Sequence, residues 1–317
     1  MKDKILITGA NGQLGSVLTK ALQNIYGIDN VIATDIKFNA SFKGHFEFLD
    51  ATDFKSITYV IKEHDITEVY HMAAILSASG EQQPLRTWEI NNQTFLNVLE
   101  ASRIHGIKKV FYPSSIAVYG TNAPKNNTPQ DFFLTPTTVY GMSKAAGENW
   151  ANYYFLKYGL DVRSLRYPGV IGHQTSPGGG TTDYAVDAYH YAVKGETFTC
   201  FLNETASLPM IYMDDAIRAT IELMQTPTNA IKTRTSYNIA SISFNPEELK
   251  ASISKIFPKF KMIYKPDFRQ EIADSWPNSI DDTIARTDWG WKPNFDLEAM
   301  TKDMIKHLKQ NYKIENA

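Results

Sequence analysis

Three side chains in the middle of the chain have the types and spacing needed to move a proton to or from an alcohol. Tyr140 and Lys144 are four residues apart in a predicted helix, so their side chains lie on one face. A cation about 5 Å from the phenol, at an effective dielectric of about 20, favours the phenolate by about 3 kcal/mol. This predicts a Tyr140 pKa lowered by about two units. Ser115 ends a predicted strand, where its hydroxyl can bind the same substrate oxygen. The alternative is a solvated helix face on which Tyr and Lys happen to be neighbours.

A glycine-rich turn near the start of the chain has the pattern of a dinucleotide-binding loop. An apolar run at residues 4–8 precedes Gly9, Gly12 and Gly15, and apolar residues at helical spacing follow at 17–22. A strand, a glycine turn and a helix in this order allow a pyrophosphate to sit on the helix N-terminus. The residues predicted to contact the dinucleotide here are Gly9, Asn11, Gly12, Gln13, Leu14 and Gly15.

An acidic residue after the second predicted strand favours NAD over NADP. Asp35 ends the run 31–35 and lies 20 residues after Gly15. Its carboxylate can accept hydrogen bonds from the adenosine ribose and repels a 2′-phosphate, although nearby Lys37 weakens this argument. Later strand ends supply further predicted cofactor contacts, namely Asp50, Ala51, Ala73 and Ala74.

Strands and helices alternate along most of the chain, which predicts an α/β fold with a Rossmann-type, doubly wound parallel sheet. Ligands then bind outside the carboxyl ends of the strands, where every candidate above is placed. The predicted strands are 4–8, 31–35, 46–49, 68–74, 109–115, 162–166 and 236–240, with helices at 54–64, 84–105 and from 140 onwards. We assign residues 1–169 and 214–240 to an NAD-binding domain. Residues 170–213 and 241–317 lack the alternation, and we assign them to a smaller, C-terminal substrate-binding lobe.

Taken together, these motifs resemble the extended short-chain dehydrogenase/reductase family over essentially the whole chain. The matching pieces are the glycine loop, Asp35, residues 50–52, 71–74, Asn91, 113–120, Tyr140 with Lys144, 212–215 and 285–293. The resemblance implies NAD as cofactor, held also by Asn91, Tyr167 and the catalytic Tyr140 and Lys144, with Lys144 on the nicotinamide ribose. It also implies a homodimer built by the helices that carry Asn91 and Tyr140.

One further stretch suggests the substrate. Residues 177–186, PGGGTTDYAV, resemble the signature of the short-chain type of L-threonine 3-dehydrogenases, and Gly169 replaces the Asn that many sugar-nucleotide members show after Arg-Tyr-x. The resemblance implies NAD-dependent oxidation of L-threonine at C3 to 2-amino-3-oxobutyrate, in threonine breakdown towards glycine or aminoacetone.

The same stretch suits an amino acid, because backbone N–H groups of residues 178–180 and a helix start can bind a carboxylate. The substrate ammonium is assigned to either Asp183 or Glu81. The predicted substrate contacts are Ser77, Ser115, Tyr140, Gly180, Thr181, Thr182 and Trp276. The alternatives are a threonine-capped glycine connection and, for Trp276, simple packing.

Two other functions remain open at this stage. A nucleotide-sugar epimerase or dehydratase would use the same three catalytic residues, and a non-catalytic regulatory protein would keep only the NAD site.

Composition excludes several other classes. The net charge is −2, and we find no Lys/Arg block, so no nucleic-acid partner is expected. Cys200 is the only cysteine, which fits a reducing compartment and a small buried side chain. No membrane span or leader is expected, and the predicted location is cytoplasmic. The seven histidines have no metal-ligand spacing, so no metal site is predicted.

Overall fold

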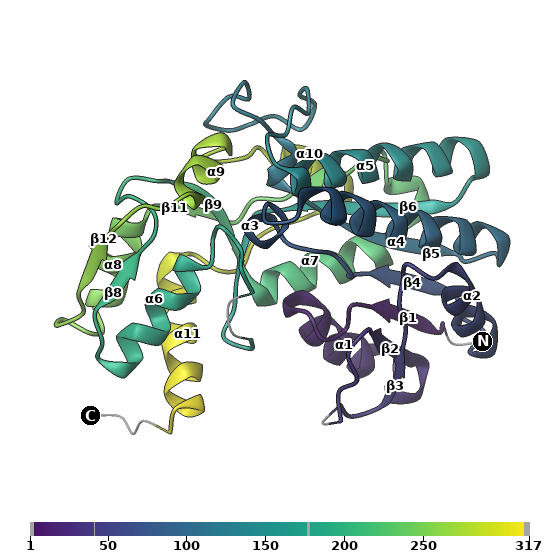
Figure 1. Cartoon of the computed structure of the whole chain (residues 1–317), viewed down its shortest axis with the longest axis horizontal. Helices are drawn as coiled ribbons and strands as arrows, with labels where there is room; N and C mark the ends of the chain where they lie inside the picture. Colours follow the sequence, from purple (N-terminus) through teal and green to yellow (C-terminus); the bar gives the residue numbers. More distant parts are fainter. Residues whose placement is uncertain (1–2, 41, 176–177, 314–317) are drawn as a thin grey trace.

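A seven-stranded sheet forms the centre of the protein in the computed structural model, which describes residues 3–40, 42–175 and 178–313 (Figure 1). The strand order is β10-β6-β5-β4-β1-β2-β3, and every neighbouring pair is parallel. The predicted Rossmann-type α/β fold is therefore confirmed. The strands are β1 Ile5–Thr8, β2 Val31–Asp35, β3 His45–Phe48, β4 Glu68–His71, β5 Lys109–Ser115, β6 Asp161–Tyr167 and β10 Tyr237–Asn238.

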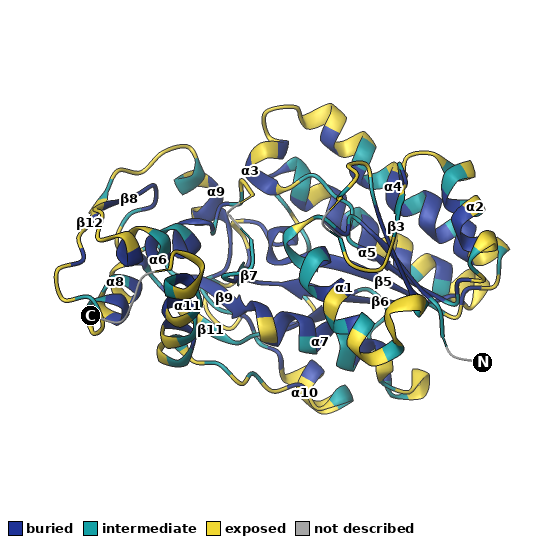
Figure 2. Cartoon of the chain, turned by 90° about the horizontal axis from the view of Figure 1, so that it is seen from below, coloured by how far each residue is buried: buried dark blue, intermediate teal, exposed yellow. Residues whose placement is uncertain are grey.

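Helices cover both faces of this sheet, which explains why its central strands read as continuous apolar runs. On one face, α1 (Gln13–Tyr26) and α7 (Met213–Gln225) bury Leu18 and Leu223 against the sheet. On the other face lie α2 (Phe54–Glu63), α4 (Pro84–Ile104) and α5 (Val139–Tyr158), with Ile57, Val98 and Ala151 in the core. The buried residues between the layers are dark blue in Figure 2.

The segment after β4 differs from the prediction. The strand ends at His71, three residues early, and residues for which no helix was predicted form the short helix α3 (Ser77–Gly80). The neighbouring strand β1 ends at Thr8, whose carbonyl accepts the last ladder bond from the Met72 N–H at 3.0 Å. Beyond that point β4 has no backbone partner in β1, so the chain leaves the sheet.

A smaller lobe lies beside the carboxyl edge of the sheet (Figure 1). It contains a three-stranded sheet, β7 (Gly169–Ile171), β9 (Leu208–Tyr212) and β11 (Ile242–Phe244), and a two-stranded sheet, β8 (Phe198–Cys200) with β12 (Met262–Tyr264). Its helices are α6 Tyr184–Lys194, α8 Pro246–Ser254, α9 Arg269–Ser275 and α11 Leu297–Asn311. Cys200 is fully buried in this lobe, as its interpretation as a small apolar side chain predicted.

One part of the C-terminal segment packs on the first domain instead of the lobe. Ala285, in α10 (Thr283–Trp289), and Trp291 belong to the core beneath α1 and α7. The Trp291 indole N–H also donates to the Ala240 carbonyl at 3.1 Å. The division at residue 241 remains a prediction, and the chain crosses between the two units again near residue 283.

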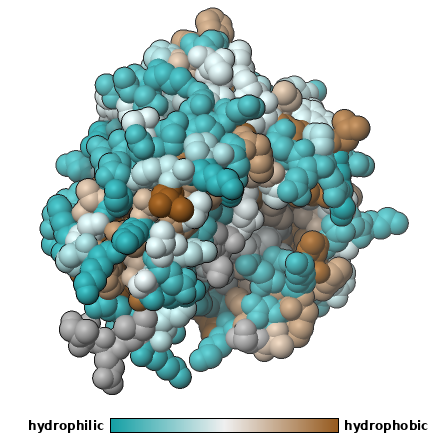
Figure 3. Space-filling model, turned by 60° about the vertical axis from the view of Figure 1, so that its left-hand side comes forward, coloured by the Kyte–Doolittle hydropathy of each residue, from teal (hydrophilic) through white to brown (hydrophobic). Residues whose placement is uncertain are grey.

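Among the residues that the structure describes, no helix combines the length and the apolar character needed to span a bilayer. Viewed towards the smaller lobe, the surface is mostly hydrophilic and carries separate small hydrophobic groups (Figure 3).

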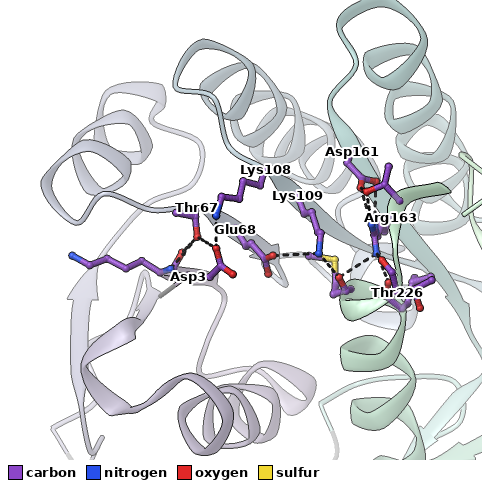
Figure 4. A network of polar contacts seen from close by, with 12 residues as sticks. Asp3, Thr67, Glu68, Lys108, Lys109, Asp161, Arg163 and Thr226 are labelled. Atoms are coloured by element: carbon purple, nitrogen blue, oxygen red, sulfur yellow. Dashed lines mark hydrogen bonds and ion pairs between the residues drawn. The ribbon is translucent and has the colours of Figure 1, made fainter. Parts of the chain in front are cut away.

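A polar network ties together the strands' amino ends, opposite the edge where ligands are expected (Figure 4). Lys109 lies 3.5 Å from the buried Glu68 carboxylate, joining β5 to β4. In β6, Arg163 pairs with Asp161 at 2.7 Å and donates to the Thr226 carbonyl at 2.6 Å just after α7. These contacts fix the strands in register and leave the carboxyl edge open for binding.

Candidate active site

Two adjoining hollows lie at the carboxyl edge of the central sheet. The first, of about 600 Å³, runs along the ends of β1, β2 and β4. The second, of about 230 Å³, lies between the end of β5, the start of α5 and the smaller lobe. Gly12, Met72 and Ala74 line both, so a ligand that fills the first can reach into the second.

The glycine loop forms the floor between the hollows. Gly9 has φ +69°, and a Cβ atom there would lie 2.7 Å from the Ala73 backbone nitrogen, so glycine is required. The Gly12 N–H donates to the Gly9 carbonyl at 3.1 Å, and α1 begins at the next residue. The N-terminus of α1, with its unpaired N–H groups and positive dipole end, therefore faces the space where a phosphate would lie.

Most of the predicted cofactor residues line one of the hollows. Gly9, Gly12, Asp35, Asp50, Ala51, Ala73 and Ala74 line the first, whereas Gln13, Leu14, Gly15, Tyr140, Lys144 and Tyr167 line the second.

Asn11 and Asn91 line neither hollow. The Asn11 backbone N–H donates to the Asp35 carboxylate at 3.1 Å. The Asn91 amide accepts from the Ile75 N–H at 2.8 Å and donates to the Ser143 hydroxyl at 3.2 Å. Both asparagines therefore support residues around the hollows.

One wall of the first hollow was not predicted from the sequence. Arg86, Glu89, Ile90, Gln93 and Thr94 project into it from α4. Their spacing of three and four residues places them on one helical face, and this spacing is visible in the sequence. It went unrecognised because nothing local shows which face of α4 meets the cofactor cleft.

The three predicted catalytic residues come together in the second hollow. Ser115 ends β5, and Tyr140 and Lys144 lie on the first turns of α5. Thr138 caps this helix by accepting from the Gly141 N–H at 3.1 Å. The Lys144 ammonium lies 5.4 Å from the centre of the Tyr140 ring, close to the separation expected from helical spacing.

The predicted lowering of the Tyr140 pKa is wrong for this structure. Burial raises the pKa of Tyr140 to about 12, and a hydrogen bond with Ser115 opposes this only in part. Burial also lowers the pKa of Lys144 to about 7. Removing each charge from water costs more free energy here than the attraction between the two groups supplies.

A buried ion pair joins the elements that carry the catalytic residues, β5 and α5, to β6. Glu148, one turn beyond Lys144 on α5, accepts two hydrogen bonds from Arg166 at 2.9 and 2.7 Å. The Ser114 hydroxyl also donates to this carboxylate at 2.5 Å. Because Ser114 precedes Ser115 on β5, Glu148 fixes the end of the strand relative to the helix that carries Tyr140 and Lys144.

The far wall of the second hollow comes from the smaller lobe. The predicted carboxylate site on this wall is wrong. The N–H groups of Gly179 and Gly180 both donate to the Asp183 carboxylate at 2.8 Å. They are therefore not exposed to bind a substrate carboxylate as predicted. Pro177, at the start of the same motif, lies outside the described residues.

Several hydroxyl groups and one acid line the second hollow. The predicted substrate residues Ser77, Ser115, Tyr140, Gly180, Thr181, Thr182 and Trp276 all line the second hollow. The Ser77 and Thr181 hydroxyls lie 3.4 Å apart.

Of the two acids left open for an ammonium group, Asp183 lines the hollow, and burial raises its pKa against the lowering effect of the glycine N–H groups. Glu81 follows α3, and its carboxylate accepts instead from the Val139 N–H at the start of α5, at 2.8 Å.

Comparison with known families and structures gives this site a context. The NAD dependent epimerase/dehydratase family matches residues 5–240. The chain belongs to this family. This match, together with the dehydrogenase structures described next, makes it an NAD-dependent oxidoreductase, and NAD is its cofactor.

Some similar proteins carry only a general family description, and others are named as L-threonine dehydrogenases. An uncharacterised epimerase/dehydratase from Staphylococcus aureus strain MRSA252 is 44% identical, with 99% of both chains covered. A partial consensus L-threonine 3-dehydrogenase is 53% identical with a TM-score of 0.96, covering 97% of this chain and 99% of that one. A GalE-like L-threonine dehydrogenase from Cupriavidus necator, in a holo form, is 52% identical with a TM-score of 0.95, covering 96% and 100%.

The homodimer expected for this chain remains a prediction. A monomeric L-threonine 3-dehydrogenase from a metagenome, covering 97% of this chain and 99% of its own, is 47% identical with a TM-score of 0.95. Similar folds in this group therefore include at least one monomer, and the helices α4 and α5 alone do not decide the assembly.

In the part of the chain that the structure describes, two groups of possible metal ligands lie outside the two hollows. In the first, His45 and His64 each contact the same Glu47 oxygen, at 2.8 and 2.6 Å, which are hydrogen-bond distances. In the second, the rings of His173 and His307 stack in parallel at 4.0 Å, with planes 4° apart. Because these two ring planes are nearly parallel and lie apart, a single ion cannot lie in both planes in this arrangement.

Proposed function

We propose that this protein oxidises L-threonine at C3, giving 2-amino-3-oxobutyrate, NADH and a proton. The observation that supports this proposal most strongly is the size and lining of the second hollow. Its volume of about 230 Å³ lies below the roughly 300–1,000 Å³ of sites for drug-sized ligands. It combines an alcohol-handling group of Ser115, Tyr140 and Lys144 with the acid and hydroxyls of the opposite wall. This combination suits a small hydroxy amino acid.

For NAD, we assign the first hollow to the adenosine half and the α1 N-terminus to the pyrophosphate. Asp35 is placed to accept hydrogen bonds from the ribose hydroxyls, and its charge opposes a 2′-phosphate. Ala73 and Ala74 are small enough to let the cofactor pass from the first hollow into the second. NAD, when bound, supplies the nicotinamide that accepts the hydride, together with its positive charge.

We assign proton transfer to the coupled pair of Tyr140 and Lys144. Ser115 donates to or accepts from the substrate oxygen and so orients it towards the phenol. Because burial lowers the pKa of Lys144 to about 7, the pair has lost one proton above that pH and can accept the proton of the threonine hydroxyl through Tyr140. Lys144 also lies where it can hold the nicotinamide ribose.

The amino-acid end of the substrate is assigned to the lobe wall. Asp183 lines the hollow, and two backbone N–H groups hold its carboxylate, so we assign it the substrate ammonium. The hydroxyls of Ser77, Thr181 and Thr182 are assigned to the substrate carboxylate. Trp276 forms the apolar cover of the hollow and excludes water from the reacting atoms.

A nucleotide-sugar epimerase or dehydratase is the second candidate. The family includes such enzymes, and the curated Staphylococcus aureus relative carries only the general epimerase/dehydratase description. A nucleotide-sugar, however, needs a long groove beyond the catalytic tyrosine, and the small second hollow argues against it. A purely regulatory NAD-binding protein would need none of the three catalytic side chains that meet here.

The test is the appearance of NADH absorbance when the protein receives NAD with L-threonine, with L-allo-threonine, or with UDP-glucose. We expect NADH only with a 3-hydroxy amino acid, and fastest with L-threonine. Tyr140→Phe is the matched variant, and it should bind NAD but lose about 100-fold or more in turnover. A flat trace with L-threonine refutes the proposed function, and near-wild-type turnover of Tyr140→Phe refutes the assigned base.

A further inference from the structure

Lys125 lies outside both hollows, yet its side chain reaches the wall of the second one. It belongs to the loop that joins Ser115 to Tyr140. Its ammonium donates to the backbone carbonyl of Trp276 at 2.9 Å and to that of Asp274. Trp276 is only 5% exposed, and it lines the proposed substrate site. The Lys125 side chain therefore links the catalytic segment to the cover of the hollow.

The contacts are those of a cation that caps a helix. Asp274 belongs to α9, whose C-cap is Trp276, and the last carbonyls of a helix have no partner within it. An ammonium at this end satisfies them and is favoured by the helix dipole. Trp276 thus begins the extended segment after α9 at a point fixed by Lys125.

The Lys125 backbone also binds the segment that follows Trp276. Its carbonyl accepts from the N–H groups of Asn278 at 2.7 Å and Ser279 at 3.1 Å. The pairing continues when the Thr128 N–H donates to the Ser279 carbonyl at 3.0 Å. Residues 125–128 and 276–279, about 150 positions apart in the sequence, are therefore joined through both side-chain and backbone bonds.

Burial makes the charged form of the Lys125 ammonium less favourable than it is in water. Lys125 is half-buried, and burial lowers its pKa while the Asp274 charge opposes this effect. The Asp274 carboxylate accepts from the Gln270 amide at 2.7 Å, and the bonds that Lys125 makes are to carbonyls. A lysine on a surface loop usually keeps its ammonium in water, so this one requires a structural reason.

We propose that Lys125 is a positioning residue that holds Trp276 over the bound substrate and thereby couples the substrate lobe to the loop between Ser115 and Tyr140. This inference rests on the proposed function. Because Lys125 touches neither the cofactor cleft nor the reacting atoms, its loss should weaken binding of the small substrate and spare the chemical step.

The first experiment compares three variants in steady-state kinetics. Lys125→Met removes the charge and keeps the aliphatic stem, and it should raise KM for L-threonine about tenfold while kcat changes less than about threefold. Lys125→Arg keeps a cation with donors and should restore most of the affinity. Lys265→Met, at an exposed lysine of the same lobe, is the matched control and should resemble wild type. An equal rise in KM for NAD, or a fall in kcat at unchanged KM, overturns the proposal.

A double-mutant cycle separates action through Trp276 from general loosening. In a Trp276→Ala background, Lys125→Met should raise KM for L-threonine less than about twofold, because the side chain that Lys125 positions is already gone. A full tenfold effect in that background overturns the proposal.

Hydrogen exchange supplies a readout that needs no turnover. In the NAD-bound protein, Lys125→Met should speed exchange at the amides of Asn278 and Ser279 and leave the central sheet unchanged. Unchanged exchange at those amides overturns the proposal. If exchange speeds up but wild-type protein fails to oxidise L-threonine, the contact holds the segment as inferred and it is the proposed function that fails.

Discussion

Replacing Asp183 by asparagine tests the assigned ammonium contact most directly. An Asn side chain has nearly the same shape, and its carbonyl oxygen can still accept from the N–H groups of Gly179 and Gly180. Asp183 is 9% exposed, so water screens its charge little. Asp183→Asn therefore removes the charge from the wall and leaves the loop geometry in place.

The expected loss follows from the strength of a hydrogen bond to a charged group, about 1.5–3 kcal/mol, which corresponds to a roughly 10- to 150-fold lower kcat/KM for L-threonine. The assay is the initial rate of NADH formation with L-threonine and with 3-hydroxybutanoate, which lacks the ammonium group. Activity with 3-hydroxybutanoate should be unchanged or higher.

Asp187→Asn is the matched control, because Asp187 lies in the first turn of α6 but is not part of the hollow's lining. It should leave kcat/KM for L-threonine near the wild-type value. Equal losses with both substrates for Asp183→Asn, or no loss with L-threonine, would show that Asp183 does not hold the ammonium.

Four other outcomes are expected. Because burial lowers the pKa of Lys144 to about 7, kcat/KM for L-threonine should rise about tenfold per pH unit below pH 7 and level off above it; a flat pH–rate profile across this range contradicts the assignment. Asp35→Ser should lower kcat/KM with NAD and raise it with NADP, since it removes the charge that repels a 2′-phosphate, and an unchanged ratio of initial rates would count against the role. Glu148→Gln leaves the Arg166 guanidinium buried without a charged partner, so urea titration should show a free energy of unfolding lower by about 3–5 kcal/mol; a loss below about 1 kcal/mol would mean that the pair is not needed. The resemblance implies a homodimer through α4 and α5, where Trp150 is 38% exposed, so light scattering should give twice the chain mass and Trp150→Glu half of that; a monomeric wild type removes this expectation.

Local sequence determined the framework of this protein. The run Ile5–Thr8 followed by Gly9 specifies a strand and a tight turn, because the apolar side chains require burial and the φ of +69° requires glycine. Parallel strands place their carboxyl ends at one edge, so Ser115 and Asp35 were predictable as neighbours of the same cleft. Helical spacing was enough to pair Tyr140 with Lys144.

Tertiary structure alone decided how these groups behave. The pKa values of Tyr140 and Lys144 moved apart because Lys144 is buried and Tyr140 is partly buried, and the extent of burial is set by segments far away in the sequence. The choice of Asp183 over Glu81 for the hollow, and the use of glycine N–H groups by Asp183, depend on how the lobe meets the sheet. The bond from Lys125 to the carbonyl of Trp276 joins residues with no local relation. Desolvation and long-range contact are properties of the packed chain, whereas turn geometry and periodicity are written in a few consecutive residues.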